Sequence, residues 1–421
     1  MTFVQENLWI AGAVIVGAVV AQGLWIAVDF FRRAAHENAQ RSRVAELLEL
    51  RLAAARKHQA EQEKTTFSWA GWRKFEIKRR EPADPSGQAC SFYLAPHDGK
   101  PIPAFEPGQF LTFQLAIPGQ AKPVVRCYSL SDSPRPDHYR VTIKRIPPRG
   151  DAPPGLASNF FHDHLGEGDL VDVRAPGGRF FVDMARDAPV VLLAAGVGIT
   201  PLLCMLNAIV ESGSSRETWF FFGVRHRDEH IMREHLDRVT REHENVRLHV
   251  CYSDPRDGVD VQGTDYHHDG RVSAELLREL LPSSNYDFYM CGPPPMMDAL
   301  TAGLKQWGVP DDRVHFEKFG PTPGKAKPKP KPDTIADGPP VTFKKSGKTI
   351  PWDATFEHLW EFAAANGVEI DSGCLEGNCG SCMTAILSGE VRYAEDPAYP
   401  YEKGTCLACS CIPNGPLELD A

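Results

Sequence analysis

The sequence of 421 residues lacks several patterns by which common protein classes are identified. No internal repeat is apparent, so a repeat architecture is not expected. None of its 15 histidines falls into a His-Glu-x-x-His spacing, which argues against a zincin-type metalloenzyme. Its basic residues are not interleaved with an aromatic platform, so no nucleic-acid partner is expected. The length itself predicts two to four domains.

Cysteine is scarce over most of the chain. Six of the eleven cysteines fall between Cys374 and Cys411, and the other five are scattered in apolar or motif contexts. A disulfide framework would need a more even distribution of cysteines. The pattern therefore favours a reducing compartment.

The C-terminal cysteines have the spacing of an iron-sulfur site. Four residues separate Cys374 from Cys379, and two separate Cys379 from Cys382. This is the plant-type [2Fe-2S] spacing, which needs one further thiolate from a distant segment. Spacing alone leaves three candidates for it: Cys406, Cys409 and Cys411. The last 60 residues contain no histidine, which disfavours a zinc site.

Near the N-terminus, residues 8–28 form a 21-residue run whose only strongly polar member is Gln22. A helix of this length can cross the hydrocarbon core of a bilayer. No Lys or Arg precedes the run, which disfavours a cleaved signal peptide, and four arginines follow it closely. The positive-inside rule then places the N-terminus outside and the later domains in the cytoplasm. We expect a single-pass anchor over residues 1–30 in the inner membrane, with the lipid bilayer as a partner.

Residues 31–64 contain no Gly or Pro and are rich in helix formers, so they predict a helical stalk. Val44, Leu47, Leu48 and Leu52 make an apolar stripe that could pair two stalks into a dimer. The stripe is shorter than the three or four heptads that a coiled coil needs. A single helix that is solvated or lies on the membrane is therefore favoured.

Short β-rich runs punctuated by Gly and Pro occupy residues 65–185. About six strands at this spacing predict an antiparallel β-barrel. It contains the motif Arg126-Cys127-Tyr128-Ser129-Leu130, in which an arginine suits a phosphate and a tyrosine can lie against a flat ring. Gly155 and Ser158 precede a predicted helix over residues 159–165, whose free N–H groups suit a pyrophosphate.

Residues 186–320 alternate between apolar strands and helices, which predicts a parallel α/β sheet. The apolar run 189–195 leads into the segment 196–201 (GVGITP) and a predicted helix. The glycines there let the backbone approach a pyrophosphate. Cys291 and Gly292 end a later strand, at the sheet edge where ligands bind. A small buried hydrophobic residue is the alternative interpretation of Cys291.

Residues 321–340 are rich in Pro and Lys and predict a semi-rigid linker. Residues 341–421 then fit a small β-grasp ferredoxin with a helix over residues 355–366. The sequence as a whole predicts a multidomain chain: a transmembrane helix, an antiparallel β-barrel, an α/β nucleotide-binding domain and an α+β β-grasp domain.

In this order the motifs of the two middle domains resemble the ferredoxin-NADP reductase superfamily. The resemblance implies that Arg126, Tyr128 and Ser129 hold the flavin ring and its adjacent phosphate. Four further residues are expected at the flavin: Leu130, Gly155, Ser158 and Phe319. The stretch 126–178 is similar to the reductase half of flavohaemoglobins, which implies FAD. Relatives of the phthalate dioxygenase type use FMN, so FAD is favoured over FMN.

The same resemblance implies a nicotinamide nucleotide on the α/β domain. Its expected contacts are Gly196, Gly198, Thr200, Pro201, Cys291, Gly292 and Pro293. In the family the Cys of Cys-Gly-Pro lies beside the nicotinamide, and a terminal segment like residues 316–320 brings an aromatic and an acid to the flavin face. Three residues are therefore expected to be catalytic: Cys291, Ser129 and Glu317.

Residues 341–421 resemble the C-terminal ferredoxin module of modular flavin reductases, in which the last ligand lies in a Leu-Ala-Cys segment. That favours Cys409 as the fourth ligand, beside Cys374, Cys379 and Cys382. Over residues 70–421 the chain is similar to phenylacetate-epoxidase and hybrid-cluster-protein reductases. These relatives lack an N-terminal anchor.

The resemblance implies an enzyme that passes electrons from NAD(P)H to FAD, then to [2Fe-2S], and then to a redox partner protein. We expect a membrane-associated oxygenase, hydroxylase, desaturase or demethylase as that partner. A quinone or ferric reductase is the alternative within enzymes, and a redox-sensing membrane protein the alternative outside them. No globin segment precedes the flavin domain, so nitric-oxide dioxygenation by this chain alone is not expected.

The choice of nucleotide and the charge distribution are less decisive. Arg225 and Arg227 suit a 2′-phosphate, whereas Asp228 or Glu229 suits a 2′-hydroxyl; NADH is favoured and NADPH stays open. Residues 339–421 hold 5 Lys and Arg against 12 Asp and Glu, a net charge of −7. This acidic end could steer a basic partner or simply be solvated.

Overall fold

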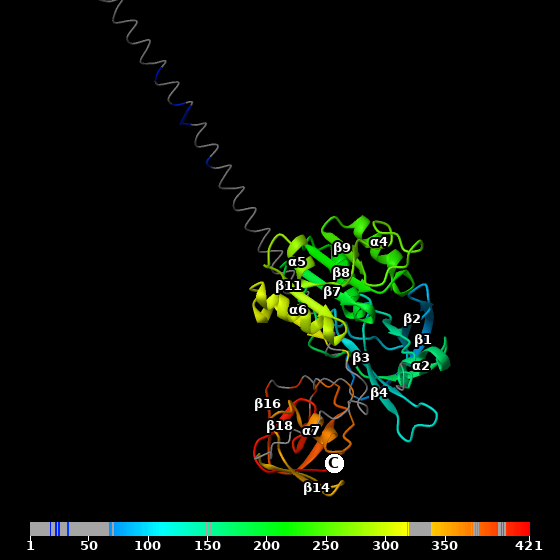
Figure 1. Cartoon of the computed structure of the whole chain (residues 1–421), viewed down its shortest axis with the longest axis vertical. Coiled ribbons are helices and arrows are strands. Elements are labelled where there is room, and N and C mark those ends of the chain that lie inside the picture. The colour runs from blue at the N-terminus through cyan, green and yellow to red at the C-terminus, as the bar shows by residue number, and fades with distance from the viewer. Residues whose placement is uncertain are drawn as a thin grey trace, which may run out of the picture. The chain divides into compact units, whose positions relative to one another are not determined.

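The computed structural model divides the chain into two units, Met1–Thr66 and Phe67–Ala421. In the first unit the structure describes residues 17, 22, 24, 25 and 32. In the second it describes residues 67–69, 71–148, 150, 153–317, 319, 338–371, 373, 375, 377, 379–394, 397, 399 and 401–421. Apart from residue 32, the predicted stalk lies outside the described residues, as does most of the predicted linker. Every element below belongs to the second unit (Figure 1).

The prediction of a membrane location is corrected here. Among the residues that the structure describes, no helix is both long enough and apolar enough to cross a bilayer. Nearly all of the 21-residue apolar run that prompted the prediction lies outside those residues. The prediction of a membrane anchor therefore rested on hydropathy alone, and the inner-membrane location is not supported.

A six-stranded antiparallel barrel comes first in the second unit. Its strands are β1 (Arg73–Pro82), β2 (Ala89–Pro96), β3 (Phe110–Leu115), β4 (Val124–Ser129), β5 (Tyr139–Lys144) and β6 (Leu170–Val173), in the order β4-β3-β6-β1-β2-β5. A bridge between Leu130 and Val141 joins the two outer strands and closes the barrel. Buried aromatic residues fill its interior, among them Phe75, Phe92 and Phe113. Helix α2 (Leu156–His164) adds Phe161 to this core.

A parallel sheet follows, in the order β10-β9-β8-β7-β11-β12. Its strands are β7 (Val190–Ala195), β8 (Thr218–Val224), β9 (Val246–Tyr252), β10 (His268–Asp269), β11 (Asp287–Cys291) and β12 (Val314–Glu317). Its helices are α3 (Ile199–Glu211), α4 (Arg233–Glu242), α5 (Ala274–Leu280) and α6 (Pro294–Gln306). Short 3-10 turns lie at η1 (Gly196–Gly198), η2 (Arg227–Glu229) and η3 (Asp311–Arg313).

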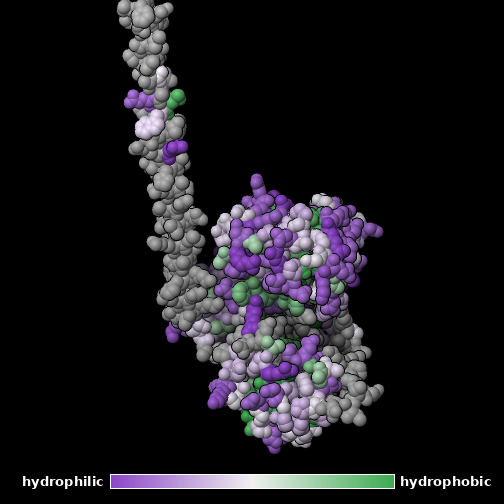
Figure 2. All heavy atoms as spheres, turned by 90° about the vertical axis from the view of Figure 1, so that its left-hand side faces the viewer, coloured by the Kyte–Doolittle hydropathy of each residue, from purple (hydrophilic) through white to green (hydrophobic). Residues whose placement is uncertain are grey.

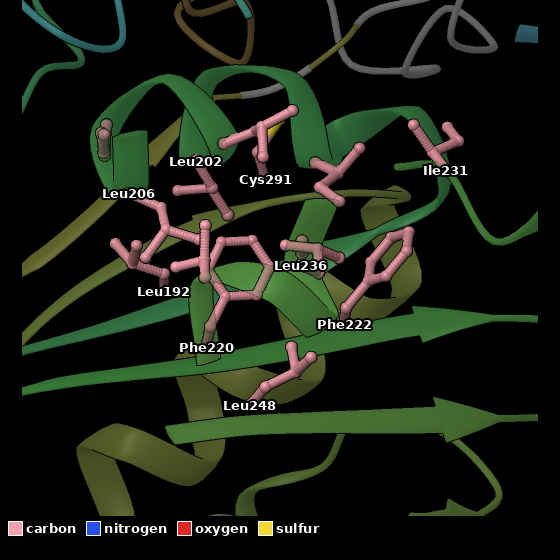
Figure 3. Packing of buried hydrophobic residues seen from close by; sticks show 14 of the residues in the cluster. Leu192, Leu202, Leu206, Phe220, Phe222, Ile231, Leu236, Leu248 and Cys291 are labelled. Carbon is pink, nitrogen blue, oxygen red and sulfur yellow. The ribbon is translucent and has the colours of Figure 1, made fainter. Parts of the chain in front are cut away.

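Both faces of this sheet are covered, because alternate residues of its strands are apolar on either side. Leu192, Phe220 and Phe222 pack with residues of α3 and α4 (Figure 3). Val191 and Phe221 pack with residues of α5 and α6 instead. A fully buried Leu or Phe side chain contributes about 1.5–3 kcal/mol each. This double covering explains why the predicted strands are continuous apolar runs.

The C-terminal part contains a sheet in the order β14-β13-β19-β15-β17 and a separate β16-β18 pair. Its strands are β13 (Pro340–Phe343), β14 (Lys348–Pro351), β15 (Met383–Ser388), β16 (Val391–Tyr393), β17 (Thr405–Leu407), β18 (Cys411–Pro413) and β19 (Leu417–Leu419). Strands β13 and β19 are parallel although they lie far apart in the sequence. Helix α7 (Leu359–Ala365) packs Leu359 and Phe362 into the core of this part.

Candidate electron-transfer site

Strand β4 carries the motif that the sequence singles out for flavin. It pairs with β3, so that Arg126 lies opposite Phe113 and Tyr128 opposite Leu111. Arg126 donates from its guanidinium to the Val125 carbonyl at 2.5 Å, and burial lowers its pKa without neutralising an arginine. No carboxylate of the described residues forms an ion pair with Arg126. Its positive charge is therefore available to an anionic group such as a phosphate.

Tyr128 lies two residues after Arg126, and its ring is held in place by two neighbouring aromatic rings. The ring meets Phe113 and Phe161 edge to face, with centroids 5.7 and 5.4 Å apart. Burial raises the pKa of Tyr128, so the hydroxyl stays protonated. A neutral, partly exposed aromatic ring locked by two others is suited to lie against the flat ring of a flavin.

The predicted phosphate-binding helix start is present at α2. Gly155 is its N-cap residue, and a Cβ there would lie 2.5 Å from Ser158 Oγ. Ser158 is buried and donates from its hydroxyl to the Gly155 carbonyl at 3.4 Å. No side chain caps this helix start, so its first N–H groups remain for a ligand. The helix begins three residues earlier than the sequence predicts.

The three residues expected to be catalytic meet at one place. Ser129 Oγ, at the end of β4, donates to Glu317 Oε2 at 3.0 Å, across 188 positions of sequence. Glu317, at the end of β12, is paired in register with Cys291 at the end of β11. All three residues are buried. A hydroxyl, a carboxylate and a thiol thus gather where the barrel meets the parallel sheet, although their catalytic roles stay predictions.

The Gly-x-Gly and Cys-Gly-Pro segments touch each other at the carboxyl ends of neighbouring parallel strands. A Cβ on Gly198 would lie 2.3 Å from the carbonyl oxygen of Cys291. Only a glycine allows this approach of η1 to β11. Gly196 has a φ of +54° and opens η1, while Pro293 is the N-cap residue of α6. Crevices beyond the carboxyl ends of such strands are where open α/β sheets bind nucleotides.

Four other predicted contacts have mixed surroundings. Thr200 Oγ1 donates to the Val197 carbonyl at 3.0 Å, and both Thr200 and Pro201 are buried in α3. Gly292 is so close to Met296 Sδ that a Cβ would lie 2.9 Å from it. Phe319 is 36% exposed, two residues after Glu317. Thr200 and Pro201 are therefore placed to stabilise the turn η1 rather than to contact a ligand. The ring of Phe319 is accessible to one.

The cysteine loop brings three of the predicted ligands into the same buried region. Cys379, Cys382 and Cys409 are each at most 2% exposed, and the sulfurs of Cys382 and Cys409 are 3.0 Å apart. The backbone N–H of Gly377 donates to the Cys409 sulfur at 3.3 Å, as suits a thiolate cluster ligand. Cys374 lies outside the described residues, and no group of three or more metal-ligating side chains is found within them. The donor set of buried thiols fits a [2Fe-2S] cluster.

The other two candidates for the fourth ligand bond to each other. The thiols of Cys406 and Cys411 are hydrogen-bonded, which together with burial raises the pKa of Cys411. Cys406 and Cys411 are also completely or almost completely buried in the core of the C-terminal part. The geometry therefore supports Cys409 in the ligand role.

The structure also reveals residues that the motifs could not indicate. Asn207 in α3 donates from Nδ2 to Asp132 Oδ1 of the barrel at 2.8 Å, and its Oδ1 accepts from His235 Nε2 at 2.7 Å. His230 is 1% exposed and contacts the Tyr252 hydroxyl at 3.0 Å. No motif in the sequence singles out His230 or His235. Their partners are 22 and 28 positions away, which local pattern does not reveal.

Comparison with known proteins gives this geometry a context. Residues 192–302 match the oxidoreductase NAD-binding domain, and residues 341–414 match the 2Fe-2S iron-sulfur cluster binding domain. The flavohemoprotein of Halalkalibacterium halodurans is 40% identical over 256 residues, which are 60% of this chain and 61% of that protein. The chain thus spans about three fifths of the length of the curated relatives it matches.

Two solved structures cover overlapping portions of the chain. The flavohem-like FAD/NAD-binding domain of nitric oxide dioxygenase from Vibrio cholerae is 29% identical with a TM-score of 0.54, and it covers 60% of this chain and 100% of its own. Phthalate dioxygenase reductase is described as modular for electron transfer from pyridine nucleotides to [2Fe-2S]. It is 28% identical with a TM-score of 0.50, over 83% of this chain and 98% of its own.

Fold, site and comparisons together define the class: the chain is an oxidoreductase in which a FAD/NAD-binding reductase domain and a [2Fe-2S] ferredoxin domain share one polypeptide. More particularly, it is an NAD(P)H-dependent flavin/[2Fe-2S] reductase with an architecture like that of phthalate dioxygenase reductase. The predicted cofactors and the predicted enzyme class are confirmed.

Proposed function

We propose that this chain is the reductase component of an oxygenase or hydroxylase system and delivers single electrons to a separate redox partner protein. Bound FAD would take up a hydride and release its electrons one at a time, and the [2Fe-2S] cluster would carry each onward. The chain's own residues do the positioning. Arg126 and Tyr128 hold the flavin, the η1 turn holds the nucleotide, and the buried thiols hold the cluster.

One observation supports this proposal. The loop that carries Cys379 and Cys382 contacts strand β4 on one side, and its end at Met383 is exposed on another side, where a partner could bind. A Cβ on Gly373 would lie 2.9 Å from Cys379 Sγ and 3.5 Å from Val125 Cγ1, next to Arg126. Met383, directly after Cys382, is 42% exposed. Electrons can therefore enter the cluster from one side and leave it on the other.

The surface is compatible with a transient protein partner. The C-terminal domain's net charge of −7 favours a partner with a basic docking face. On the face displayed in Figure 2, hydrophobic side chains of the described residues are scattered among hydrophilic ones. Such a mixture suits partners that bind, accept an electron and leave.

NADH is proposed as the preferred donor, because Arg225, one of the two arginines that suit a 2′-phosphate, is already paired with a carboxylate. Arg225 forms an ion pair with Glu229, which also accepts from Lys144 at 3.0 Å. Arg256 holds Asp228 through contacts of 2.7 and 3.0 Å. A 2′-phosphate bound by Arg225 would have to displace Glu229 from it, whereas a 2′-hydroxyl needs no such rearrangement.

An anaerobic titration of the purified holoprotein tests the proposal. NADH should bleach the flavin, and the EPR signal of a reduced [2Fe-2S] cluster should grow with it. NADPH should do the same at higher concentration. A reduced flavin without any cluster signal, even after dithionite, would refute the relay. Slow reduction by either nucleotide and no acceptor-dependent turnover would instead indicate a redox sensor.

A further inference from the structure

Arg174 links the barrel to the ferredoxin domain. It follows strand β6, and its backbone N–H donates to the Thr112 carbonyl of β3 at 2.9 Å, which fixes its position in the barrel. Its guanidinium donates to the backbone carbonyl of Cys379, a predicted cluster ligand 205 positions away. This bond spans the two domains between which an electron must pass.

Two aromatic rings accompany the same guanidinium. Its central carbon lies 4.4 Å from the Trp72 ring centroid, on the barrel side, and 5.2 Å from that of Tyr399, on the ferredoxin side. A cation facing aromatic rings at these distances is attracted by about 0.5–2 kcal/mol, depending on how far it is desolvated. Arg174 therefore contacts one ring from each domain.

Tyr399 in turn packs on the cysteine loop. Gly380 has a φ of +70°, and a Cβ there would lie 2.3 Å from Tyr399 Cε1. Arg174 therefore restrains the backbone between Cys379 and Cys382 indirectly, because it packs on Tyr399 and Tyr399 packs on Gly380.

The anchored loop also lies beside the flavin strand. A Cβ on Gly373 would lie 2.9 Å from Cys379 Sγ and 3.5 Å from Val125 Cγ1, so Gly373 lies against both the Cys379 sulfur and the Val125 side chain of β4. Val125 directly precedes Arg126 of the flavin motif. Holding two reacting groups in one geometry removes the search for that geometry from each transfer, so a loop held against β4 relays faster than one that is tethered only through a linker.

We propose that Arg174 is a positioning residue for electron transfer from the flavin to the cluster, holding the loop of Cys379 against strand β4. The proposal rests on the electron relay of the proposed function. In the step concerned, one electron leaves the reduced flavin and one enters the oxidised cluster, with NADH as the reductant. Arg174 neither accepts the electron nor touches the nucleotide.

The test uses stopped-flow absorbance and freeze-quench EPR on the full holoprotein mixed with NADH under anaerobic conditions. Arg174→Gln should leave flavin bleaching and cluster content unchanged but slow the appearance of the cluster EPR signal at least tenfold. Arg174→Lys keeps the positive charge but lacks the planar guanidinium. Only the guanidinium can donate to the Cys379 carbonyl and at the same time face the rings of Trp72 and Tyr399. The Arg174→Lys variant should keep the cluster midpoint potential of the wild type without restoring the rate.

Arg79→Gln is the matched control. Arg79 also faces a ring in the barrel, with its guanidinium 3.8 Å from the Tyr93 centroid, and pairs with Glu81 at 3.2 Å. Both of these partners belong to the barrel. Its removal should leave both kinetic phases at the wild-type rate.

The outcomes distinguish a failure of the electron relay from a failure of the role proposed for Arg174. Wild-type protein that bleaches its flavin without reducing a cluster refutes the relay itself. A relay that works equally fast in the wild type and Arg174→Gln refutes only the role of Arg174. Should Arg174→Gln lose its cluster, Trp72→Leu is read instead, because it removes the barrel-side ring alone. Cluster reduction at the wild-type rate in Trp72→Leu would then overturn the proposal.

Discussion

At the scale of single residues, the most informative contact joins Ser129 to Glu317. Neither side chain could act on a nicotinamide from its own domain alone, because one belongs to the barrel and the other to the parallel sheet. Their 3.0 Å hydrogen bond and the register of Glu317 with Cys291 make one buried group of three. Such a group can fix the position of a reacting ring to within a fraction of an ångström.

The first prediction concerns this group. Ser129→Ala and Glu317→Gln should each slow hydride transfer from NADH to the flavin by roughly tenfold to a hundredfold, since small misplacements of reactants have effects of this size. The KM for NADH should change much less than kcat, because the loss falls on the reacting geometry. Stopped-flow bleaching of the flavin measures the hydride-transfer rate, and steady-state kinetics give KM and kcat.

Ser91→Ala serves as its control. Ser91 is also a buried serine of the barrel, and its hydroxyl contacts Thr142 Oγ1 at 2.8 Å. Its loss should leave hydride transfer unchanged. Equal slowing in Ser91→Ala and Ser129→Ala would mean that the barrel is merely sensitive to buried hydroxyl loss.

The second prediction separates the candidates for the fourth cluster ligand. Cys409→Ser should abolish the EPR signal of the reduced [2Fe-2S] cluster, because the Cys409 sulfur lies 3.0 Å from that of Cys382. Cys406→Ser is an equally buried change in the same segment and should keep the signal. Flavin content should stay normal in both. Loss of the cluster in Cys406→Ser with retention in Cys409→Ser would reverse the assignment.

At the scale of elements, the turn η1 shows how a close backbone approach builds a binding edge. It links the buried strand β7 to helix α3 and passes directly over the end of β11. The apolar run before it and the helix after it were predictable. The approach itself depends on Gly198, where any side chain would meet the backbone of Cys291.

The third prediction follows from this approach. Gly198→Ala should destabilise the protein by about 1–3 kcal/mol, as overpacking usually does, and should raise the KM for NADH. Thermal unfolding and steady-state kinetics test it. Gly166→Ala is the control, since its Cβ would lie at an ordinary 3.9 Å from Asp169 Oδ2. An unchanged KM in Gly198→Ala would show that η1 can shift without disturbing the nucleotide.

Helix α4 shows how a tertiary contact sets where a helix begins. It begins at Arg233, directly after Met232, which has a φ of +56°. The preceding residues do not extend the helix, because His230 turns into the core toward Tyr252. Burial lowers the pKa of His230 to about 3 and keeps the ring neutral.

At the scale of the whole molecule, buried and half-buried polar groups join the barrel to the parallel sheet. Asp132 of the barrel accepts from Asn207, and Asn207 contacts His235 of α4. Burial, followed by the positive charges of Arg140 and Arg238, lowers the pKa of His235 to about 4, against the weaker opposing effects of Asp132 and Glu211. The protein therefore folds with this ring neutral.

The fourth prediction is a loss of stability at acidic pH. Between pH 6.5 and about 4 the unfolded chain binds a proton at His235 that the folded chain does not, so stability falls as the pH falls through this window. His235→Gln keeps a donor for Asn207 and cannot titrate. Between pH 7 and 5 it should lose about 1 kcal/mol less than the wild type, or about 2–4 °C in Tm.

Differential scanning calorimetry at the two pH values provides the measurement. His164→Gln, at an exposed histidine of α2, should keep the wild-type pH dependence. A pH dependence in His235→Gln that equals the wild type would show that His235 is protonated in the folded protein at pH 5.

Much of the architecture was predictable, because it depends on the hydrophobicity and spacing of residues within short segments. Apolar runs between Gly-x-Gly and Cys-Gly-Pro predicted the parallel strands, and the cysteine spacing predicted the cluster loop. Strand β12 and the strands β15 to β18 were not foreseen, since short strands with mixed burial have no distinct period. The membrane location was wrong, since it rested on hydropathy over residues that no described helix supports.

The sequence by itself determined the modules, their order and their cofactors, because each depends on residues within one short segment. The tertiary structure decided which residues meet across segments. It joined Ser129 to Glu317, brought the Cys409 sulfur next to that of Cys382 as the family resemblance favours, and placed Arg174 on the carbonyl of Cys379. These contacts span 27 to 205 positions. No periodicity or spacing encodes them, because they form only when separately folded sheets pack together.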